Sequence, residues 1–419
     1  MRQAERPERK FSFSSILGLN YLGTLVGTLA IALLIFPALG RVYSMAVLSL
    51  FNLSVCLYLL PKLGFKKQGL AVCLVAISLV INVGCIVKKH DIDQTYLKTL
   101  YYAFDIGEHI KKNPEVFPDG GVRGMVSSVA NLIDEFEPVD RTRSIYQEID
   151  IINYPDGSTF LCLDENLQIS TFGQLAYHEG FIHMPIAMHH NYPKKVLLLG
   201  GGDGFAAREL LRYPHVESIT QVELDPAMID LAKNHKWMLE MNKNSFDDER
   251  VNLIVDDAFD WVRLNRHLKF DAIYVDFPFP FNYVTLRLYS VELYRNLRKM
   301  LSPGGFVAID SPLSTDVDAK EDDSFYLYNC MIFTTIKAAG FTHPIPYDLE
   351  THGFITCSKD DMPMSIEMPY DFPLELSYVN DQMLNEIDEL QKFPYEISDK
   401  HLNSIFKPTL IYTPKYRYD

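Results

Sequence analysis

The sequence predicts an α/β protein organised around a Rossmann-like sheet that binds a nucleoside. An apolar strand at residues 195–199 leads directly into the glycine-rich turn Gly200–Gly204, and a helix is expected at residues 205–213. Glycine suits this turn because it adopts unusual φ values and lets a ligand approach the backbone closely. A second strand, residues 218–222, ends in Glu223, whose carboxylate is placed to bond the two hydroxyls of a ribose.

Charge is distributed unevenly along the 419 residues, which leave room for two or three domains. Residues 1–90 contain two acidic residues and ten Lys and Arg, so the formal net charge of −15 divides into +8 there and −23 in the remainder. Such an acidic domain is a poor partner for nucleic acid and attracts cations, although acidity that only aids solubility fits equally well. The six cysteines form no Cys-x-x-Cys pair, so we expect a reducing compartment and no metal site.

Residues 1–90 are predicted to form a transmembrane region with three helices. The uncharged runs 16–36, 42–60 and 69–87 are each long enough to cross about 30 Å of hydrocarbon. The basic residues that flank these runs place residue 90 outside by the positive-inside rule, whereas a domain that uses a nucleoside is expected in the cytosol. We expect a multi-pass protein of the inner (cell) membrane with its acidic domain in the cytoplasm, and the orientation stays open.

Two smaller regions lead to the Rossmann-like domain. Residues 91–142 are expected to form a helical connector, with helical spacing of apolar residues at 96–112 and 122–136. A small β-strand domain, residues 143–195, follows. Its expected strands are residues 144–153, 159–163 and 167–171, and a helix then leads to the glycine turn.

The Rossmann-like domain is expected to cover residues 196–359. Its later elements are the strand 272–275, the helix 288–300, the strand 306–309, the helix 326–339 and the strand 354–357. The tail, residues 360–419, contains one helical stretch at 380–392 and no recognisable chemistry. We expect the tail to pack on the domain or to contribute to a homodimer.

These segments resemble the spermidine synthases, which are polyamine aminopropyltransferases. The resemblance rests on Leu161–Gln168, on Tyr177-His178-Glu179 and on the glycine turn, and it extends from about residue 144 to residue 359. The segments 222–225, 256–259 and 288–294 also fit. It implies a class I methyltransferase-type sheet, and the apolar runs in front make the chain similar to the membrane-bound bacterial branch, which usually has more spans.

The resemblance implies the transfer of an aminopropyl group from decarboxylated S-adenosylmethionine to an amine, with release of methylthioadenosine and without a metal. An alkylamine is mostly protonated at pH 7, and removing its proton costs roughly 4–5 kcal/mol. Carboxylates and hydroxyls in a pocket with little water can hold the two cationic substrates and accept this proton.

By resemblance, eight residues line the donor pocket: Gln147, Gln168, His178, Gly200, Gly202, Asp203, Glu223 and Asp257. Asp203 would hold the aminopropyl ammonium, Glu223 the ribose, and Asp257 the adenine amino group. Each residue also has an ordinary explanation. Asp203 is placed to cap a helix, Glu223 could be a solvated acid, the glutamines could be ordinary strand residues, and His178 could be structural.

On the acceptor side, Asp276 is the residue expected to accept the amine proton, since it follows an apolar strand at the carboxyl end where ligands of such sheets bind. Tyr177 and Tyr347 would orient the amine, although either could be a core residue. Phe279 stands where the family has a second aspartate that helps to bind the polyamine, and Gly173 and Gln174 stand where the family commonly has an Asp-Glu pair. The acceptor is therefore putrescine or a longer, more apolar or aromatic amine.

Two other functions remain open. A methyltransferase that uses intact S-adenosylmethionine would have no need of Tyr177-His178-Glu179 or of the β-strand domain before it. A nucleoside-binding sensor without catalytic activity is favoured by Phe279, and the joint presence of Asp203, Asp276 and Tyr177 is evidence against it.

Overall fold

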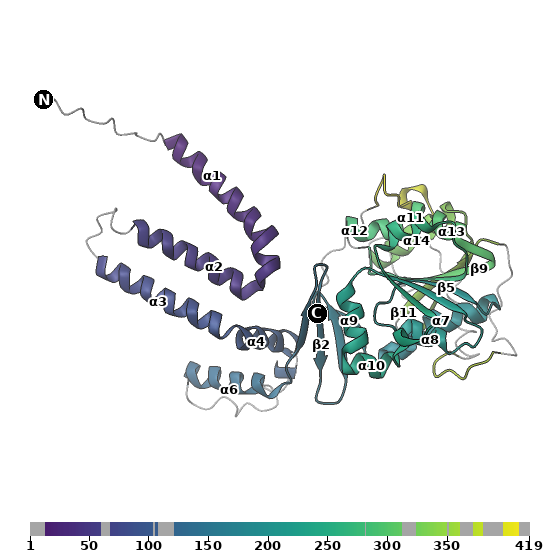
Figure 1. Ribbon diagram of the computed structural model, residues 1–419, viewed down its shortest axis with the longest axis horizontal. Helices are drawn as coiled ribbons and strands as arrows, with labels where there is room; N and C mark the ends of the chain where they lie inside the picture. The colour runs from purple at the N-terminus through teal and green to yellow at the C-terminus, as the bar shows by residue number, and fades with distance from the viewer. Residues whose placement is uncertain are drawn as a thin grey trace. The chain divides into compact units, whose positions relative to one another are not determined.

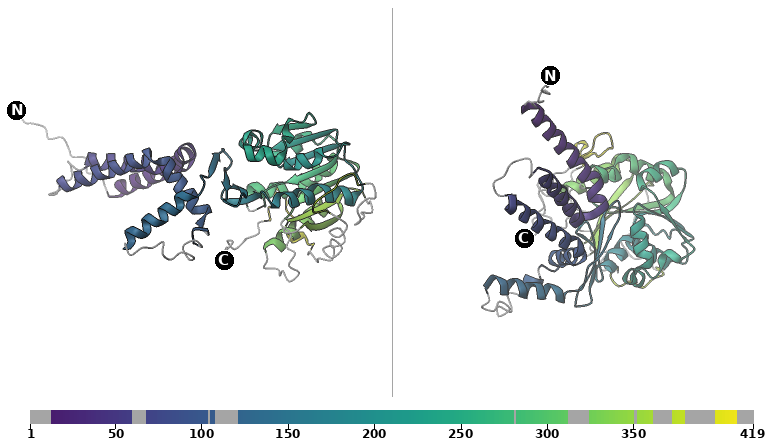
Figure 2. Two further views of the ribbon diagram at one scale, coloured as in Figure 1. Left: turned by 90° about the horizontal axis from the view of Figure 1, so that it is seen from below. Right: turned by 60° about the vertical axis from the view of Figure 1, so that its left-hand side comes forward.

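The computed structural model describes most of the chain, and the described residues form two compact units. The described residues are 13–59, 68–103, 105–107, 121–280, 282–311, 324–349, 352–360, 372–379 and 397–409. The first unit comprises residues 1–140 and 152–156, and the second comprises residues 141–151 and 157–419. The first unit consists mainly of helices, whereas the second contains a large sheet with helices on both faces (Figure 1, Figure 2).

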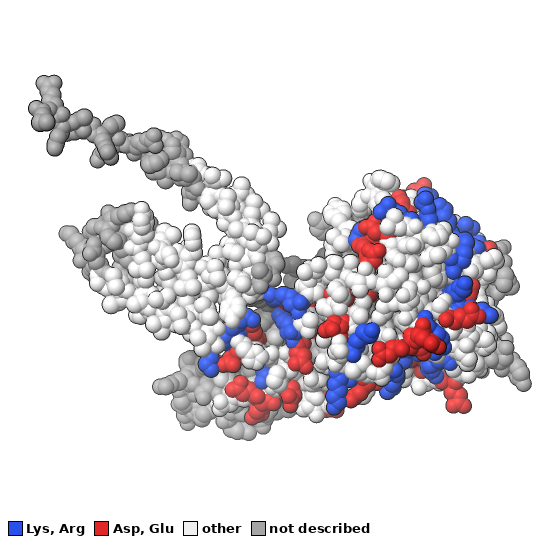
Figure 3. Space-filling model, in the orientation of Figure 1, with Lys and Arg blue, Asp and Glu red and all other residues white. Residues whose placement is uncertain are grey.

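Apolar helices occupy the three runs predicted to span a membrane. The helical segments of this unit are α1 (Phe13–Ala30), the π-helix η1 (Ile31–Ile35), α2 (Phe36–Leu59), α3 (Gln68–Val87), α4 (Lys89–Tyr101) and α6 (Gly121–Glu135). Between the first two predicted runs, at Gly40 with φ 73°, the backbone leaves the helical conformation and α2 is sharply kinked. Figure 3 shows few charged side chains over α1 to α3.

The predicted transmembrane region with three helices is not supported. Among the residues that the structure describes, no single helix is both long and apolar enough to cross a bilayer. Residues 72–87 and 89–101 pass that test only as a pair, bent by 73°. The predicted helix 96–112 is represented by α4, which ends at Tyr101, and residues 108–120 lie outside the described part.

The expected β-strand domain is a four-stranded sheet in the order β1-β2-β3-β4. Its strands are β1 (Asp140–Arg143), β2 (Glu148–Asn153), β3 (Thr159–Leu163) and β4 (Asn166–Ser170). The strand expected at 144–153 is shorter because residues 144–147 form a turn. The Ser144 hydroxyl holds this turn by accepting the backbone N–H groups of Tyr146 and Gln147, each at 3.0 Å.

The Rossmann-like sheet is confirmed, with seven strands in the order β10-β11-β9-β8-β5-β6-β7. Its strands are β5 (Lys195–Gly200), β6 (Ser218–Glu223), β7 (Val251–Val255), β8 (Phe270–Asp276), β9 (Leu301–Asp310), β10 (Thr342–Leu349) and β11 (His352–Ser358). Strands β5 to β9 are parallel, and β11 and β10 add antiparallel pairs at one edge. The chain order reverses between β5 and β8, which is where such sheets bind ligands.

Two layers of helices cover the sheet, and each layer packs on its own hydrophobic core. The helices α7 (Gly173–His189), α8 (Phe205–Leu211), α9 (Pro226–Asn234) and α10 (Lys236–Asn242) contribute to one core. The helices α11 (Ala258–Asn265), α13 (Val291–Met300) and α14 (Ser324–Ala338) contribute to the other (Figure 1). Alternate residues of the buried strands supply both cores, as expected of a sheet covered on both faces.

Several boundaries differ from the sequence-based expectation. The strand expected at 306–309 is part of the longer β9, which begins at Leu301. The helix expected at 288–300 is divided between η4 (Arg287–Tyr289) and α13, and the short helix α12 (Tyr283–Leu286) precedes both. Ser290 caps α13 by accepting from the Leu293 N–H. Strands β7 and β10 were not predicted. The helix expected at 380–392 lies outside the described residues.

Candidate functional site

A buried tyrosine and a carboxylate meet at the carboxyl end of the sheet. Asp276 is the last residue of β8, and Tyr177 reaches it from α7. The Tyr177 hydroxyl donates a hydrogen bond of 2.8 Å to Asp276 Oδ1. The tyrosine ring is fixed by aromatic contacts, with ring centroids 5.2 Å from both His352 and Phe354. The structure therefore brings together two of the three residues expected on the acceptor side.

The glycine turn lies against two of the predicted carboxylates. A Cβ added at Gly200, whose φ is +87°, would lie 2.0 Å from the Asp276 carbonyl oxygen. One added at Gly202 would lie 2.8 Å from the carboxyl group of Glu223. Both positions thus need glycine for close approach. The turn therefore packs directly on Asp276 and Glu223 at the switch point.

Burial and mutual repulsion shift the protonation of these acids. Burial, and next the charge of Asp203, raise the pKa of Asp276 to about 7, although the Tyr177 hydrogen bond acts in the opposite direction. Burial also raises the pKa of Glu223 to about 7, with Asp203 and Asp225 contributing and the Asp225 N–H opposing. Neighbouring carboxyl groups that raise one another's pKa values in this way favour cationic ligands.

The raised pKa of Asp276 predicts a pH-dependent stability. An unfolded Asp has a pKa of about 4, so between about pH 4 and pH 7 the folded state binds more protons than the unfolded state and stability falls as pH rises. We expect the unfolding free energy of the wild type, relative to Asp276→Asn, to fall over this window by at most ~1.4 kcal/mol per pH unit. Denaturant unfolding at a series of pH values checks this, and a difference that stays constant or rises contradicts it.

Asp203 and Glu223 are engaged with local backbone in the ligand-free chain. Asp203 Oδ1 accepts the Phe205 N–H at 2.7 Å, at the start of α8. Glu223 Oε1 accepts the Asp225 N–H at 2.9 Å. Capping therefore accounts for one oxygen of Asp203, and its charge still acts on Asp276 and Glu223. Their donor-binding roles stay predictions.

The other predicted donor residues are placed less uniformly. Asp257 caps α11 by accepting the Asp260 N–H at 3.2 Å, and it also forms an ion pair with Arg287. The carboxylate expected to bind the adenine amino group is therefore already paired with a guanidinium. Gln147 donates to Asp225 Oδ2 at 3.0 Å. Gln168 is exposed, and its side-chain amide donates to the Asn166 carbonyl oxygen at 3.4 Å. Its donor-binding role stays a prediction.

His178 and Tyr347 are both buried next to the site. His178 Nδ1 lies 2.6 Å from the Gln174 carbonyl oxygen, and burial lowers the pKa of its ring to about 4. A neutral ring in these surroundings supports the pocket rather than moving a proton. Tyr347 is fully buried and stacks on Phe354 with ring centroids 5.3 Å apart. Its hydroxyl has no hydrogen-bond partner among the described residues.

Three residues of the site were not assigned a role from the sequence. Gln221 donates its side-chain amide to the Gly200 carbonyl oxygen at 3.0 Å and so fixes the glycine turn. Asp225 accepts from both Ser144, at 2.7 Å, and Gln147, which ties the β-strand domain to β6. Asp310 ends β9 as Asp276 ends β8. The rule that singled out Asp276, an acid directly after an apolar strand, applies equally to Asp310.

Phe279 and Gln174, which depart from the family pattern, lie in different parts of the second unit. Phe279 is half-buried and follows the buried Phe277. The side-chain carbonyl of Gln174 accepts from Arg208 Nη2 at 2.9 Å. Among the described residues, no group of three or more His, Cys, Asp or Glu is arranged to hold a metal ion.

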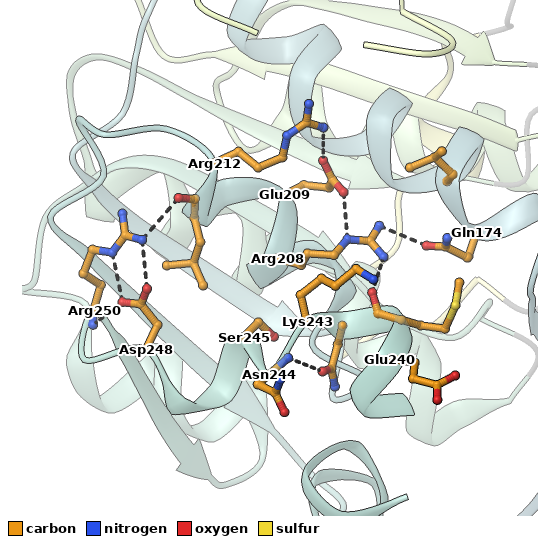
Figure 4. A pocket seen from close by; sticks show the side chains of 14 residues that line it. Gln174, Arg208, Glu209, Arg212, Glu240, Lys243, Asn244, Ser245, Asp248 and Arg250 are labelled. Carbon is orange, nitrogen blue, oxygen red and sulfur yellow. Dashed lines mark hydrogen bonds and ion pairs between the residues drawn. The ribbon is translucent and has the colours of Figure 1, made fainter. Parts of the chain in front are cut away.

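A cavity of about 650 Å³ lies beside α8 and α10, and neither Tyr177 nor Asp276 is among its lining residues (Figure 4). The guanidinium groups that line it are already engaged. Arg208 bonds Gln174 and Glu209, Arg212 bonds Glu209, and Arg250 bonds Asp248. Every arginine among the described residues that line this cavity therefore already has an acidic or amide partner. We do not place the catalytic site in this cavity.

Comparisons with known proteins point to one family. The spermine/spermidine synthase domain model matches residues 174–365. A polyamine aminopropyltransferase of Mycobacterium tuberculosis (strain ATCC 25618 / H37Rv) is 33% identical over 345 residues, which cover 80% of this chain and 56% of that protein. Polyamine aminopropyltransferase 2 of Aquifex aeolicus (strain VF5) is 29% identical over 411 residues, which cover 97% of this chain and 73% of that protein. The chain thus spans little more than half the length of the first of these relatives.

Solved structures show the same fold. A spermidine synthase from Thermotoga maritima matches with a TM-score of 0.51 and 25% identity, covering 61% of this chain and 84% of that one. A spermidine synthase in complex with the transition state analogue AdoDATO matches with a TM-score of 0.52 and 24% identity, covering 61% of this chain and 85% of that one.

Proposed function

The chain belongs to the spermidine synthase family of polyamine aminopropyltransferases, and from this premise we propose that it transfers an aminopropyl group from decarboxylated S-adenosylmethionine to an amine. The observation that carries the proposal is the hydrogen bond between Tyr177 and the half-buried Asp276 beside the glycine turn. A related protein whose structure contains the analogue AdoDATO supports the choice of donor.

In this reaction the lone pair of the acceptor nitrogen forms a bond to the carbon next to the donor sulfonium. The carbon–sulfur bond breaks, and its electrons remain on sulfur to give neutral methylthioadenosine. The amine proton passes to Asp276, whose pKa near 7 suits a group that accepts and then releases a proton near neutral pH. Tyr177 holds the carboxylate in place, and the glycine turn leaves room for the nucleoside.

Incubation of the purified full chain with decarboxylated S-adenosylmethionine and a panel of amines tests the proposal. The expected result is release of methylthioadenosine that depends on the amine. Methyl transfer from intact S-adenosylmethionine would favour a methyltransferase instead. Binding of methylthioadenosine without turnover of any amine would favour a nucleoside sensor.

The acceptor is proposed to be putrescine or a less polar amine, and Phe279 provides the test. An aspartate at this position would add a carboxylate near the acceptor and remove apolar surface. We expect Phe279→Asp to lower the KM for putrescine by about tenfold, which corresponds to ~1.4 kcal/mol of added attraction for the second ammonium. Steady-state kinetics with putrescine and with butylamine check this, because the gain requires the second ammonium. An equal gain with butylamine contradicts the explanation.

We also propose that α1 to α3 attach the chain to a membrane, with the second unit on the cytoplasmic side. The support is a set of apolar side chains on these helices that are more than half exposed, among them Tyr21, Leu25, Phe51 and Val80. Fractionation of cells before and after alkaline carbonate treatment tests attachment, and full release into the supernatant contradicts it. Protease accessibility in sealed vesicles tests the side.

A further inference from the structure

Asp310 and Asp276 occupy equivalent positions on neighbouring strands. Strands β8 and β9 are parallel, with Val275 opposite Ile309, so the two aspartates follow at the same level. Tyr274 and Ala308, two residues earlier on each strand, both belong to the core under α7. Since side chains alternate along a strand, the aspartates continue onto this same face, about 4.8 Å apart in backbone spacing.

The single hydroxyl of Tyr177 lies close to both carboxylates and bonds one of them. It donates to Asp276 Oδ1 at 2.8 Å, and it also acts to lower the pKa of Asp310. A phenol has one hydrogen to donate, so it cannot satisfy two ionised carboxylates at once. Burial and the charge of Asp276 together raise the pKa of Asp310 well above its usual value. If both Asp276 and Asp310 are ionised, one more positive charge or one more proton is needed to balance the two carboxylates.

The surroundings within the described chain do not supply that charge. The groups acting on Asp276 and Asp310 are other acids, Tyr177 and a backbone N–H, and no Lys, Arg or His of the described residues forms an ion pair with either. The Tyr347 hydroxyl, which has no described partner, is close enough for the charge of Asp310 to raise its pKa. Phe354 lies opposite Asp310 on β11. The site has acids, hydroxyls and aromatic rings, which are the groups that bind an ammonium.

We propose that Asp310 is a substrate-binding residue, and that Asp310 and Asp276 together bind the one ammonium group of the acceptor that will react. This proposal rests on the proposed function and deepens it. An ammonium has three donors, enough for both carboxylates and a hydroxyl. Because the two acids are one strand spacing apart, they bind the same nitrogen rather than the two ends of a diamine. The acceptor class is then any primary amine whose remainder fits the loop around Phe279.

Calorimetric titration of butylamine and of putrescine into the full chain saturated with methylthioadenosine tests this assignment. Methylthioadenosine has no aminopropyl ammonium, so only acceptor binding is measured. We expect Asp310→Asn, and the smaller Asp310→Ser, to weaken binding of both amines by about tenfold or more. Affinity for methylthioadenosine should change by less than about threefold. Glu217→Gln is the matched control, since its carboxylate is more than half exposed at the amino end of β6.

The outcomes separate this inference from the proposed function. Unchanged amine affinity in both Asp310 variants overturns the inference, even if the wild type releases methylthioadenosine and the proposed function stands. Loss of methylthioadenosine affinity to the same degree also overturns it, because Asp310 would then act on the donor side or on folding. Amine binding that depends on Asp310 in a wild type without turnover supports the inference and contradicts the proposed function. A wild type that binds neither amine overturns both.

Discussion

Asp276→Asn is expected to lower kcat for methylthioadenosine release by roughly 10²–10⁴, the range in which a positioned general base contributes. Asparagine fills the same space and still accepts the Tyr177 hydrogen bond, but it cannot take up the amine proton. The carboxyl group of Asp276 lies at the carboxyl end of β8 and accepts the hydrogen bond of the Tyr177 hydroxyl at 2.8 Å. Burial and the neighbouring acids raise its pKa to about 7. Quenched assays at saturating amine and donor measure the loss.

The size of this effect must be separated from a general loss of the site. Methylthioadenosine should bind Asp276→Asn within about threefold of the wild type, because the donor contacts expected of Asp203 and Glu223 are left in place. Glu217→Gln again provides the control, since Glu217 pairs with Lys194 at the opposite end of the sheet. A kcat within about threefold of the wild type would remove Asp276 from the proton transfer.

Much of the glycine turn and the strands around it could be predicted because their signals are local. Gly200–Gly204 has an apolar strand before it and a helix after it, and strict glycine requirements at Gly200 and Gly202 leave a pattern in the sequence. Acids that end parallel strands, such as Glu223 and Asp276, are also readable, since all such ends meet at one edge of the sheet.

The parts that could not be predicted depend on long-range pairing. Strand β10 contains Pro344 and Pro346 and becomes a strand only because it is an edge strand that pairs with β11. Asp257 reads as a ligand-binding acid until Arg287, 30 residues later, is brought against it. The three apolar runs meet a length criterion in the sequence, but the first of them is interrupted by the π-helix at Ile31–Ile35, so length alone does not define a regular spanning helix.

Gly200→Ala is expected to have the largest effect on folding of any single methyl group added to the site. The methyl carbon would lie 2.0 Å from the carbonyl oxygen of Asp276, which is backbone on the neighbouring strand and cannot rotate away. The φ of +87° adds a left-handed penalty of about 1–2 kcal/mol, and forcing β5 and β8 apart adds about 1–3 kcal/mol as for overpacked cores. Together these are a large fraction of the stability of a typical domain.

Gly304→Ala separates the two contributions to that loss. Gly304 has a φ of +72°, yet a Cβ added there meets nothing within 4 Å, so this variant carries the left-handed penalty without the clash. Denaturant unfolding should therefore show Gly200→Ala losing more stability than Gly304→Ala by about 1–3 kcal/mol. Gly200→Ala should also lose methylthioadenosine binding, because the displaced Asp276 backbone carries the end of β8 with it. Equal losses of stability in the two variants would mean that β5 and β8 can separate freely at the turn, and the close packing of the glycine turn on Asp276 would then not be what fixes the site.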